Sequence, residues 1–263
     1  MMPMTLDFNK IGVWLINLPE NHDRLIKMAD QLDRIGISWK LFPAVNGREK
    51  YDELIKLADP AAYSRNMGSP ILPGKLGVYA SHTSVWKEFI QSNLELALIF
   101  EDDVVFHDDF LEAVESAYAA KNHWDIVRFN CVRAKLPISQ GRINKWQLNA
   151  YVGPFTGNAA YMVKKDIAAK LVREIGPQTR ALDHELNRFF KHDYRLLGMQ
   201  PWASHTDDGN VSTITGVGFA SVKKFKWYKR LPHYRLKAAN YFRRLFWLVR
   251  KGMIFPSQKS LLD

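Results

Sequence analysis

An apolar run that ends in three consecutive carboxylates constrains the fold of this chain more than any other feature. Leu96 to Phe100 are all apolar and rich in branched and aromatic side chains, a pattern typical of a strand buried on both faces. Glu101, Asp102 and Asp103 follow directly, and carboxylates are rarely buried unless they are paired or bind a metal. We therefore predict that the strand ends at Glu101, where its carboxyl end meets a cleft, as in open α/β sheets that bind ligands there.

The spacing of these carboxylates favours a metal site. Side chains at positions i and i+2 share one face of an extended chain, so Glu101 and Asp103 can point the same way with Asp102 opposed. Two oxygen donors on one face suit Mg²⁺ or Mn²⁺, which usually binds one or two carboxylates together with substrate phosphates. The pattern indicates an enzyme that handles a nucleoside diphosphate, and the alternative is an acidic loop after a core strand.

The positive charge of the chain is concentrated near its C-terminus. The whole sequence has a net charge of +10, but residues 221–263 alone hold 12 Lys and Arg and a single acidic residue. Residues 1–220 are therefore close to neutral, which indicates an enzyme-like body with a basic arm for an anionic surface. With Cys131 as its only cysteine the chain can form no intrachain disulfide, and we expect a reducing compartment. We expect neither a secretory signal in residues 1–10 nor a membrane-spanning helix, because no run of about 18 apolar residues occurs.

Short apolar runs alternate with helical patterns, which predicts an α/β fold. A strand over 12–18, a helix over 23–35 and a strand over 39–45 form a βαβ unit, which implies parallel pairing. This order predicts a three-layer sandwich. The further expected elements are helices over 77–92, 110–120, 166–175 and 182–190, strands over 126–129, 159–163 and 194–197, a short helix near 53–58 and loops around 68–73 and 150–157.

Six short motifs occur in a fixed order between about residues 11 and 215: Ile16-Asn17-Leu18 with Arg24, Pro43 to Gly47, Gly74 to Gly77 with Ser81-His82 and Trp86, Ala97 to Val104, Thr156 to Tyr161, and Leu182-Asp183-His184. Together they resemble those of glycosyltransferase family 25, the bacterial lipooligosaccharide-type β-galactosyltransferases and the related collagen galactosyltransferases. Tyr79 departs from the pattern, where a small residue or Cys is expected, and we interpret it as a local packing change. The resemblance implies a GT-A-like fold with a Rossmann-like nucleotide-binding half, a nucleotide-sugar donor and inverting transfer to a glycan.

The resemblance also implies a metal that neutralises a UDP leaving group. We favour Asp103 as a direct metal ligand and Glu101 as a ligand or its support. His205 could complete the metal shell, and the alternative is a lone surface histidine. The expected cofactor is Mn²⁺ or Mg²⁺.

Asp183 is the favoured catalytic base. Inversion needs a carboxylate that takes the proton of the acceptor hydroxyl during in-line attack. Because Asp183 lies at an expected helix start, the alternative is an N-cap. Glu185 is the second candidate for the base, and Asp207 and Asp208 are more distant ones.

Ten residues are candidates for donor binding. Asn17, Leu18 and Arg24 follow the first strand, where a base and ribose rest in a Rossmann-like half. The alternative for Arg24 is a solvated helix face. Ala44, Asn46 and Gly47 follow the second strand, where a small residue and a tight turn would let a uracil ring lie close to the backbone. The alternative is a plain turn. Ser81 and His82 are expected to open a helix, whose N-terminus attracts anions, with a structural role as the alternative for His82. The ten are Asn17, Leu18, Arg24, Ala44, Asn46, Gly47, Lys75, Ser81, His82 and Asp102.

Residues 235–251 are predicted to form a basic amphipathic helix. Such a helix with aromatic side chains is typical of one that lies in a membrane surface. We therefore divide the chain into a glycosyltransferase domain (1–220) and a membrane-associating tail (221–263), whose residues 221–251 meet anionic lipid. The alternatives are binding of single-stranded nucleic acid and a helix packed on its own domain or on a partner chain. The expected apolar side comprises Ala238, Tyr241, Phe242, Leu245, Leu248 and Val249, and the expected basic side Arg235, Lys237, Arg243, Arg244, Arg250 and Lys251 together with Trp247.

These predictions converge on a metal-dependent inverting glycosyltransferase. It is expected to transfer a hexose, with galactose favoured, from a UDP-sugar to a lipid-linked lipopolysaccharide or lipooligosaccharide core. The expected location is the cytoplasmic face of the plasma membrane, with no nucleic-acid partner. The alternative from another class is a non-catalytic binding protein on the same fold, associated with membrane or nucleic acid.

Overall fold

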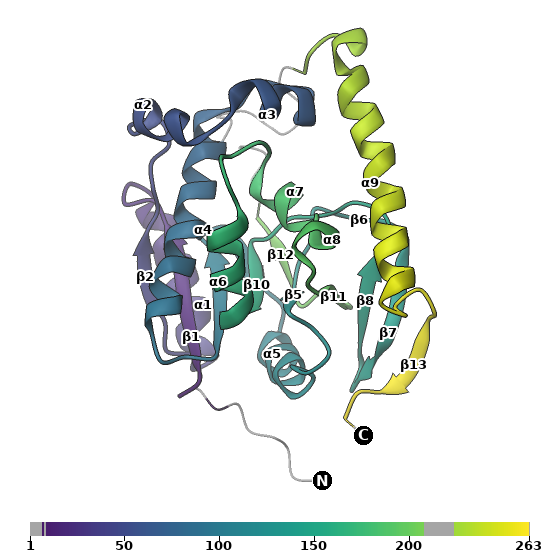
Figure 1. The fold of residues 1–263 in the computed structure, drawn as a ribbon. Helices are drawn as coiled ribbons and strands as arrows, with labels where there is room; N and C mark the ends of the chain where they lie inside the picture. Colours follow the sequence, from purple (N-terminus) through teal and green to yellow (C-terminus); the bar gives the residue numbers. More distant parts are fainter. Residues whose placement is uncertain (1–6, 8, 208–223, 263) are drawn as a thin grey trace.

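A mixed nine-stranded sheet forms the centre of the part of the chain that the structure describes (Figure 1). The structure is a computed structural model, and it describes residue 7 and residues 9–207 and 224–262. Along the sheet the strands follow the order β13-β7-β8-β11-β5-β10-β3-β1-β2. Their bounds are β1 Ile11–Asn17, β2 Lys40–Pro43, β3 Leu96–Glu101, β5 Ile126–Arg128, β7 Pro137–Ile143, β8 Trp146–Tyr151, β10 Ala160–Lys164, β11 Leu196–Gln200 and β13 Ser257–Ser260.

Two small ladders flank this sheet. Strand β4 (Val104–Phe106) pairs with β12 (Ser204–Thr206), and β6 (Arg133–Ala134) pairs with β9 (Phe155–Thr156). Strand β4 begins directly after the three carboxylates, so its pairing with β12 fixes the chain on the C-terminal side of Asp103.

The predicted βαβ unit is present. Strands β1 and β2 are parallel and are joined by α1 (His22–Arg34), whose buried side chains Met28 and Leu32 are one helical turn apart. Gly36 follows the helix with a φ of +68°, a conformation that glycine adopts without steric cost. Strand β3 pairs in parallel with β1 on the side opposite β2. The three strands therefore bring their carboxyl ends to one edge of the sheet.

Between β2 and β3 the chain forms more helix than the sequence predicted. A short helix is expected near 53–58, and the structure contains α2 (Tyr51–Leu54), a 3₁₀ turn (Ile55–Leu57) and α3 (Pro60–Met67). The sequence contains signals for both ends of α3. The Asp59 carboxylate accepts from the Ala62 amide as the N-cap, proline follows at the first helical position, and Gly68 ends the helix with a φ of +69°.

Helix α4 (Pro73–Gln91) begins at Pro73 rather than at Gly77. Proline is favoured at the first helical position, which explains the earlier start. Ser81 and His82 therefore lie inside the helix and are buried. The expectation that these two residues open a helix is wrong, and with it the idea that they form an anion site at a helix N-terminus.

Helices cover both faces of the sheet. On one face, Trp14 of β1 packs edge-on against Phe89 of α4, and α6 (Lys165–Glu174) lies beside α4 (Figure 1). On the other face, Phe100 of β3 packs against Phe110 of α5 (Phe110–Ala119), and α1 contacts β4 beside it. The predicted three-layer α/β architecture is confirmed.

Two later predictions needed correction. The helix expected over 182–190 is split into α7 (Leu182–Leu186) and α8 (Phe189–His192). The β7–β8 hairpin has no counterpart among the predicted elements. Its two-residue connection places Asn144 at a φ of +51°, which asparagine tolerates better than most residues, but neither strand shows clean alternation of apolar and polar side chains.

The C-terminal segment packs on the body of the protein, as one of the alternatives proposed. Helix α9 (Leu231–Arg250) follows a 3₁₀ turn (Trp227–Arg230) and contacts α3 and α8, and β13 pairs with β7 of the central sheet. The predicted boundary between 220 and 221 lies outside the described residues. None of the described helices is long and apolar enough to cross a membrane.

The predicted sides of α9 are partly wrong. Arg244 and Trp247, expected on the exposed basic side, are buried: the Arg244 guanidinium donates to the Val152 carbonyl (2.7 Å), and the Trp247 indole donates to Asp193 (2.8 Å). In contrast, Phe242 is 72% exposed. A helical period shows that a helix has two sides but not which side meets the body.

Candidate functional site

A cleft of about 430 Å³ lies where the carboxyl ends of β1, β2 and β3 meet. Its walls include Leu18 after β1, Ala44 after β2 and Glu101 at the end of β3. Nine of the ten predicted donor-binding residues line this cleft, together with Glu101, Asp103 and Asp183. The tenth, Asn17, lies behind the wall and contacts the cleft through Asp102.

Asp102 ties the end of β1 and the start of α1 to the end of β3. Its Oδ2 accepts hydrogen bonds from the side-chain amides of Asn17 (2.8 Å) and Asn21 (3.2 Å), and its Oδ1 accepts one from Arg24 Nη1 (3.1 Å). Because its guanidinium is paired with Asp102, Arg24 holds this corner together. Arg24 is therefore not a solvated residue of a helix face, since its guanidinium holds α1 to the end of β3.

A chain of buried hydrogen bonds holds Glu101. The Trp86 indole donates to the Tyr161 hydroxyl (2.9 Å), which lies 3.0 Å from His82 Nδ1, and His82 Nε2 lies 3.1 Å from Glu101 Oε1. A carboxylate can only accept, so Nε2 carries the proton and donates it to Glu101. A neutral His82 then accepts at Nδ1 from the Tyr161 hydroxyl. His82 is therefore a buried link that orients Glu101.

Asp103 is the member of the triplet whose carboxylate has no side-chain partner in the described part of the chain. Its Oδ1 is buried and has no hydrogen-bond partner among the described residues. Burial, together with the negative charges of Glu101 and Asp102, raises the pKa of the Asp103 carboxyl to about 7. The main-chain carbonyl of Asp103 accepts from the amide of Asp207 (2.7 Å), which fixes the turn. A bound cation would supply the charge that this site lacks.

The structure does not bring His205 together with the acidic residues. His205 is exposed on β12, and its Nδ1 lies 3.0 Å from Nε2 of His107, whereas its neighbour Thr206 lines the cleft. Successive side chains of a strand point to opposite faces, which explains the separation. Within the described part of the chain, no group of three or more His, Cys, Asp or Glu side chains is arranged to hold a metal.

Asp183 lies on the wall of the cleft, at the start of α7. Its carboxylate accepts from the amides of Gly157 (3.3 Å) and His184 (2.9 Å). Burial raises the pKa of this carboxyl, but His184, Lys75 and Arg128 together lower it below its usual value. Asp183 is not the N-cap of α7, because Ala181 occupies that position. It is an ionised carboxylate at the cleft.

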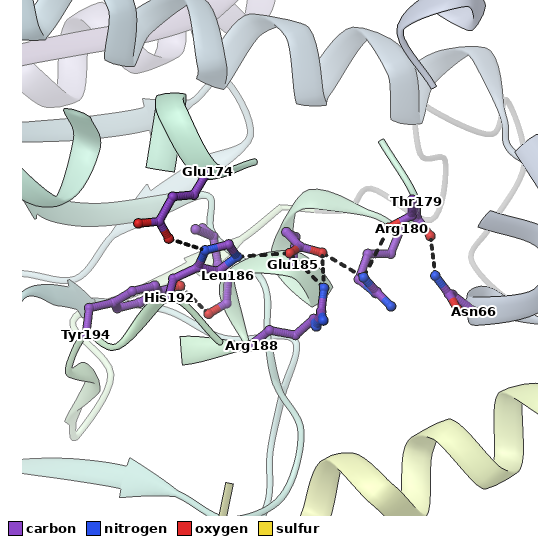
Figure 2. Close-up of polar contacts among 9 residues, drawn as sticks. All are labelled: Asn66, Glu174, Thr179, Arg180, Glu185, Leu186, Arg188, His192 and Tyr194. Atoms are coloured by element: carbon purple, nitrogen blue, oxygen red, sulfur yellow. Dashed lines mark hydrogen bonds and ion pairs between the residues drawn. The ribbon is translucent and has the colours of Figure 1, made fainter. Parts of the chain in front are cut away.

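Glu185 is not a cleft residue, and the expectation that it could serve as the base is wrong. Figure 2 shows it buried between Arg180 (2.9 Å), Arg188 (3.0 Å) and His192 (3.1 Å). Burial raises its pKa, but these three partners outweigh burial and lower the pKa to about 2. Glu185 joins α7 to α8. Asp207 is exposed outside the cleft wall, and Asp208 lies outside the described residues.

Gly47 is needed for close packing of two backbones. A Cβ atom at Gly47 would clash with the Pro73 carbonyl and the Gly77 amide at the start of α4, and one at Gly77 would clash with the Val45 carbonyl. Ser81 adds a link, because its hydroxyl accepts from the Val45 amide (2.8 Å). The turn after β2 is thereby fixed against α4, and Ala44 and Asn46 are held at the cleft.

Several cleft residues were missed by the sequence predictions. Asn130 follows β5, and the rule that located Leu18 and Ala44 at strand ends would have found it. Asn158 lies inside the Thr156 to Tyr161 motif and approaches Glu101 at 3.5 Å. The others are Glu20, Asn21, Arg48, Val78, Val132, Ala181 and Thr206, for which the sequence gives no signal beyond proximity to predicted residues.

The position of the cleft defines the class of protein. Strands β2 and β3 lie on opposite sides of β1, and ligands of open α/β sheets bind where the strand order reverses in this way. Fold and site thus define an α/β protein with a cleft at the carboxyl ends of its parallel strands. The family model of Glycosyltransferase family 25 (LPS biosynthesis protein) matches residues 10–185. The chain belongs to glycosyltransferase family 25.

Curated relatives agree with this assignment. A glycosyltransferase 25 family member of Aedes aegypti is 28% identical over 63% of this chain and 29% of its own length. Procollagen galactosyltransferase 1-A of Xenopus laevis is 32% identical over 48% of this chain and 22% of its own length. A rat protein named "Probable inactive glycosyltransferase 25 family member 3" is 28% identical over 48% of this chain and 23% of its own length. The chain thus spans less than a third of the length of these relatives.

Proposed function

We propose that this chain is a metal-assisted hexosyltransferase that transfers galactose from a UDP-sugar to a glycan acceptor with inversion. The observation that carries the proposal is the buried Oδ1 of Asp103, which has no hydrogen-bond partner among the described residues, in a cleft that also presents the ionised Asp183. Family membership and the procollagen galactosyltransferases among its relatives support a hexose donor.

The donor is proposed to lie along the ends of β1 and β2. Leu18 and Ala44 would flank the base, and the turn after β2 would contact the ribose. Lys75 and Arg48 line the cleft, and neither side chain has a hydrogen bond or ion pair to the described residues. Neither charge is held in an ion pair with the described residues, so both can bind the phosphates of a nucleoside diphosphate, whereas Arg24 is paired with Asp102.

The proposed cofactor is Mn²⁺ or Mg²⁺, held by Glu101 and Asp103. The residues fit such an ion, because a buried oxygen of Asp103 lacks a partner, and burial together with the negative charges of Glu101 and Asp102 raises the pKa of its carboxyl. Two carboxylates with phosphate oxygens are a usual set for Mg²⁺, so no third protein ligand is required. When bound, the cation neutralises the charge that develops on the departing UDP.

Asp183 is the proposed base. The acceptor hydroxyl oxygen bonds to C1 of the sugar while the bond from C1 to the UDP oxygen breaks, and the hydroxyl proton passes to the Asp183 carboxylate. The low pKa of Asp183 keeps this carboxylate ionised at neutral pH. The amides of Gly157 and His184 orient it, so its free lone pairs remain available for the acceptor.

The proposed acceptor is a lipid-linked lipopolysaccharide or lipooligosaccharide core, which the description of the family supports. Cytoplasmic placement beside the membrane follows from such an acceptor and a nucleotide-sugar donor. A second candidate function is a non-catalytic binding protein, favoured by the relative whose name marks it as inactive. A protein of that kind would retain the cleft but lose transfer.

Two substitutions in the cleft distinguish the candidates. Asp103→Asn is expected to abolish both transfer and Mn²⁺-dependent UDP binding in calorimetry, whereas Asp183→Asn is expected to retain UDP binding and lose transfer by about 100-fold or more, a typical effect of general-base loss. Asp30→Asn, on the exposed face of α1, is the matched control. Wild-type protein that binds UDP but transfers no hexose to any acceptor glycan would favour the binding protein.

A further inference from the structure

Helix α9 carries an apolar stripe that the body of the protein leaves uncovered. Arg244, Trp247 and Leu248 face the body and are buried. On the opposite side, Phe242 and Phe246 are 72% and 70% exposed, and they are one helical turn apart. Leu245 and Val249, also exposed, widen the stripe. Further exposed aromatic side chains lie before α9 (Trp227 and Tyr228) and after it (Phe255).

Basic side chains border this stripe. Arg235 and Arg243 are exposed on α9 without an ion pair to the described residues, and Lys224, Lys226 and Lys229 precede the helix. Arg250 is also exposed, but its guanidinium lies 3.6 Å from the carboxylate of Asp193 on the body. Residues 224–262 contain no Asp or Glu. The outward side therefore combines an uncovered apolar stripe with an excess of positive charge, whereas the sequence pattern placed apolar and basic residues on opposite sides.

We propose that this outward side of α9 is a docking surface for an anionic lipid membrane. Phenylalanine and leucine side chains enter the headgroup region, while arginine and lysine side chains meet lipid phosphates. The charge argues against a second copy of this chain, because a two-fold contact through the same stripe would bring the arginines of both copies together with no acidic partner on the segment. A lipid surface offers hydrocarbon to the apolar stripe and phosphate groups to the basic side chains.

The docking surface is tied to the cleft wall. Nδ1 of His233 in α9 lies 2.7 Å from the main-chain carbonyl oxygen of Asn66 in α3, and the Asn66 side chain donates to the Thr179 carbonyl (3.1 Å) (Figure 2). Thr179 is two residues from Ala181, which lines the cleft. Membrane docking through α9 thus holds the cleft at a fixed position relative to the lipid surface, independently of what the cleft transfers.

The test is co-sedimentation of the full chain with vesicles of phosphatidylcholine alone or mixed with phosphatidylglycerol. Wild-type protein is expected to bind the anionic vesicles and to dissociate at high salt. Phe242→Ser with Phe246→Ser should weaken binding by about tenfold for each phenylalanine. Arg235→Gln with Arg243→Gln should weaken it by about fivefold for each charge. Because all four side chains are exposed, these variants should retain the far-ultraviolet circular dichroism of the wild type.

Matched controls come from α1, which lies away from this surface. Ile26→Ser removes an exposed apolar side chain and Arg34→Gln an exposed charge, and both should leave vesicle binding unchanged. Unchanged binding by the double phenylalanine variant would overturn the proposal. Tighter binding to single-stranded DNA than to lipid, seen as release from the vesicles by DNA at a concentration below that of the anionic lipid, would also overturn it. So would a dimer in sedimentation equilibrium that the double phenylalanine variant converts to a monomer.

Discussion

Asp103→Asn should make the metal-free protein more stable while it abolishes the proposed metal site. The pKa of Asp103 is raised from 3.8 to about 7, because burial and the charges of Glu101 and Asp102 disfavour its ionised form. Each pKa unit corresponds to 1.36 kcal/mol, so ionisation of Asp103 in the folded state costs up to about 4 kcal/mol. Asparagine has nearly the same shape without the charge.

The sign of the pH dependence follows from this shift. The folded state holds a proton on Asp103 between about pH 4 and pH 7 that the unfolded state has released, so the wild type loses stability as pH rises through this range. At pH 8 Asp103→Asn should therefore gain about 2–4 kcal/mol in unfolding free energy, and the difference should largely vanish near pH 4. For a chain of this size, 1 kcal/mol shifts the melting temperature by about 2–4 °C, so the gain is measurable by calorimetry.

The assay is differential scanning calorimetry in the presence of a chelator at a series of pH values. Asp30→Asn controls for the loss of one carboxylate from an exposed position and should show no comparable gain. If Asp103→Asn melts at or below the wild-type temperature at pH 8, the inference of an uncompensated buried charge is refuted. Excess Mn²⁺ with UDP should stabilise the wild type and leave the variant unchanged, since only the wild type binds them.

Three further predictions concern the residues around the cleft. Tyr161→Phe should lower the unfolding free energy in urea by about 1–3 kcal/mol, because the Trp86 indole and His82 lose a buried partner; equal stability would contradict the hydrogen-bond chain. Glu185→Gln should destabilise the protein by about 3–5 kcal/mol at neutral pH, since Arg180 and Arg188 lose their buried counter-charge. The folded-state pKa of Glu185, about 2, lies below its ordinary 4.5, so its stabilisation is present above pH 4.5 and is lost as pH falls towards 2, a slope that the variant should lack. His205→Ala should leave Mn²⁺-dependent UDP affinity in calorimetry unchanged, and a large loss would reinstate His205 as a metal ligand.

The strand ends that form the cleft were predictable because buried parallel strands have a strong sequence signature. Continuous apolar runs located β1 and β3, and the polar residues after them identified the cleft edge. The base candidates could not be ranked in this way. Asp183 and Glu185 are two residues apart on one short helix, and only tertiary contacts show that Arg180, Arg188 and His192 surround one while the other faces the cleft.

Prediction failed for a different reason at His205 and α9. His205 and Thr206 are neighbours on an edge ladder, so a shift of one residue in register would exchange which side chain meets the cleft. No local pattern fixes that register, because it is set by the pairing of β12 with β4. For α9 the sequence contains two candidate contact stripes, and the body of the protein selects the one that includes Arg244, whose guanidinium finds a carbonyl partner.

The three consecutive carboxylates show how environment divides identical chemistry into separate roles. Asp102 is neutralised by Arg24 and two amides and therefore binds the corner of the sheet together. Glu101 accepts a hydrogen bond from the buried His82 and is thereby held in one orientation. Asp103 receives neither, and its buried oxygen is left without a partner. For folding alone an apolar or amide side chain at 103 would serve better, and this is the cost that the proposed cation would offset.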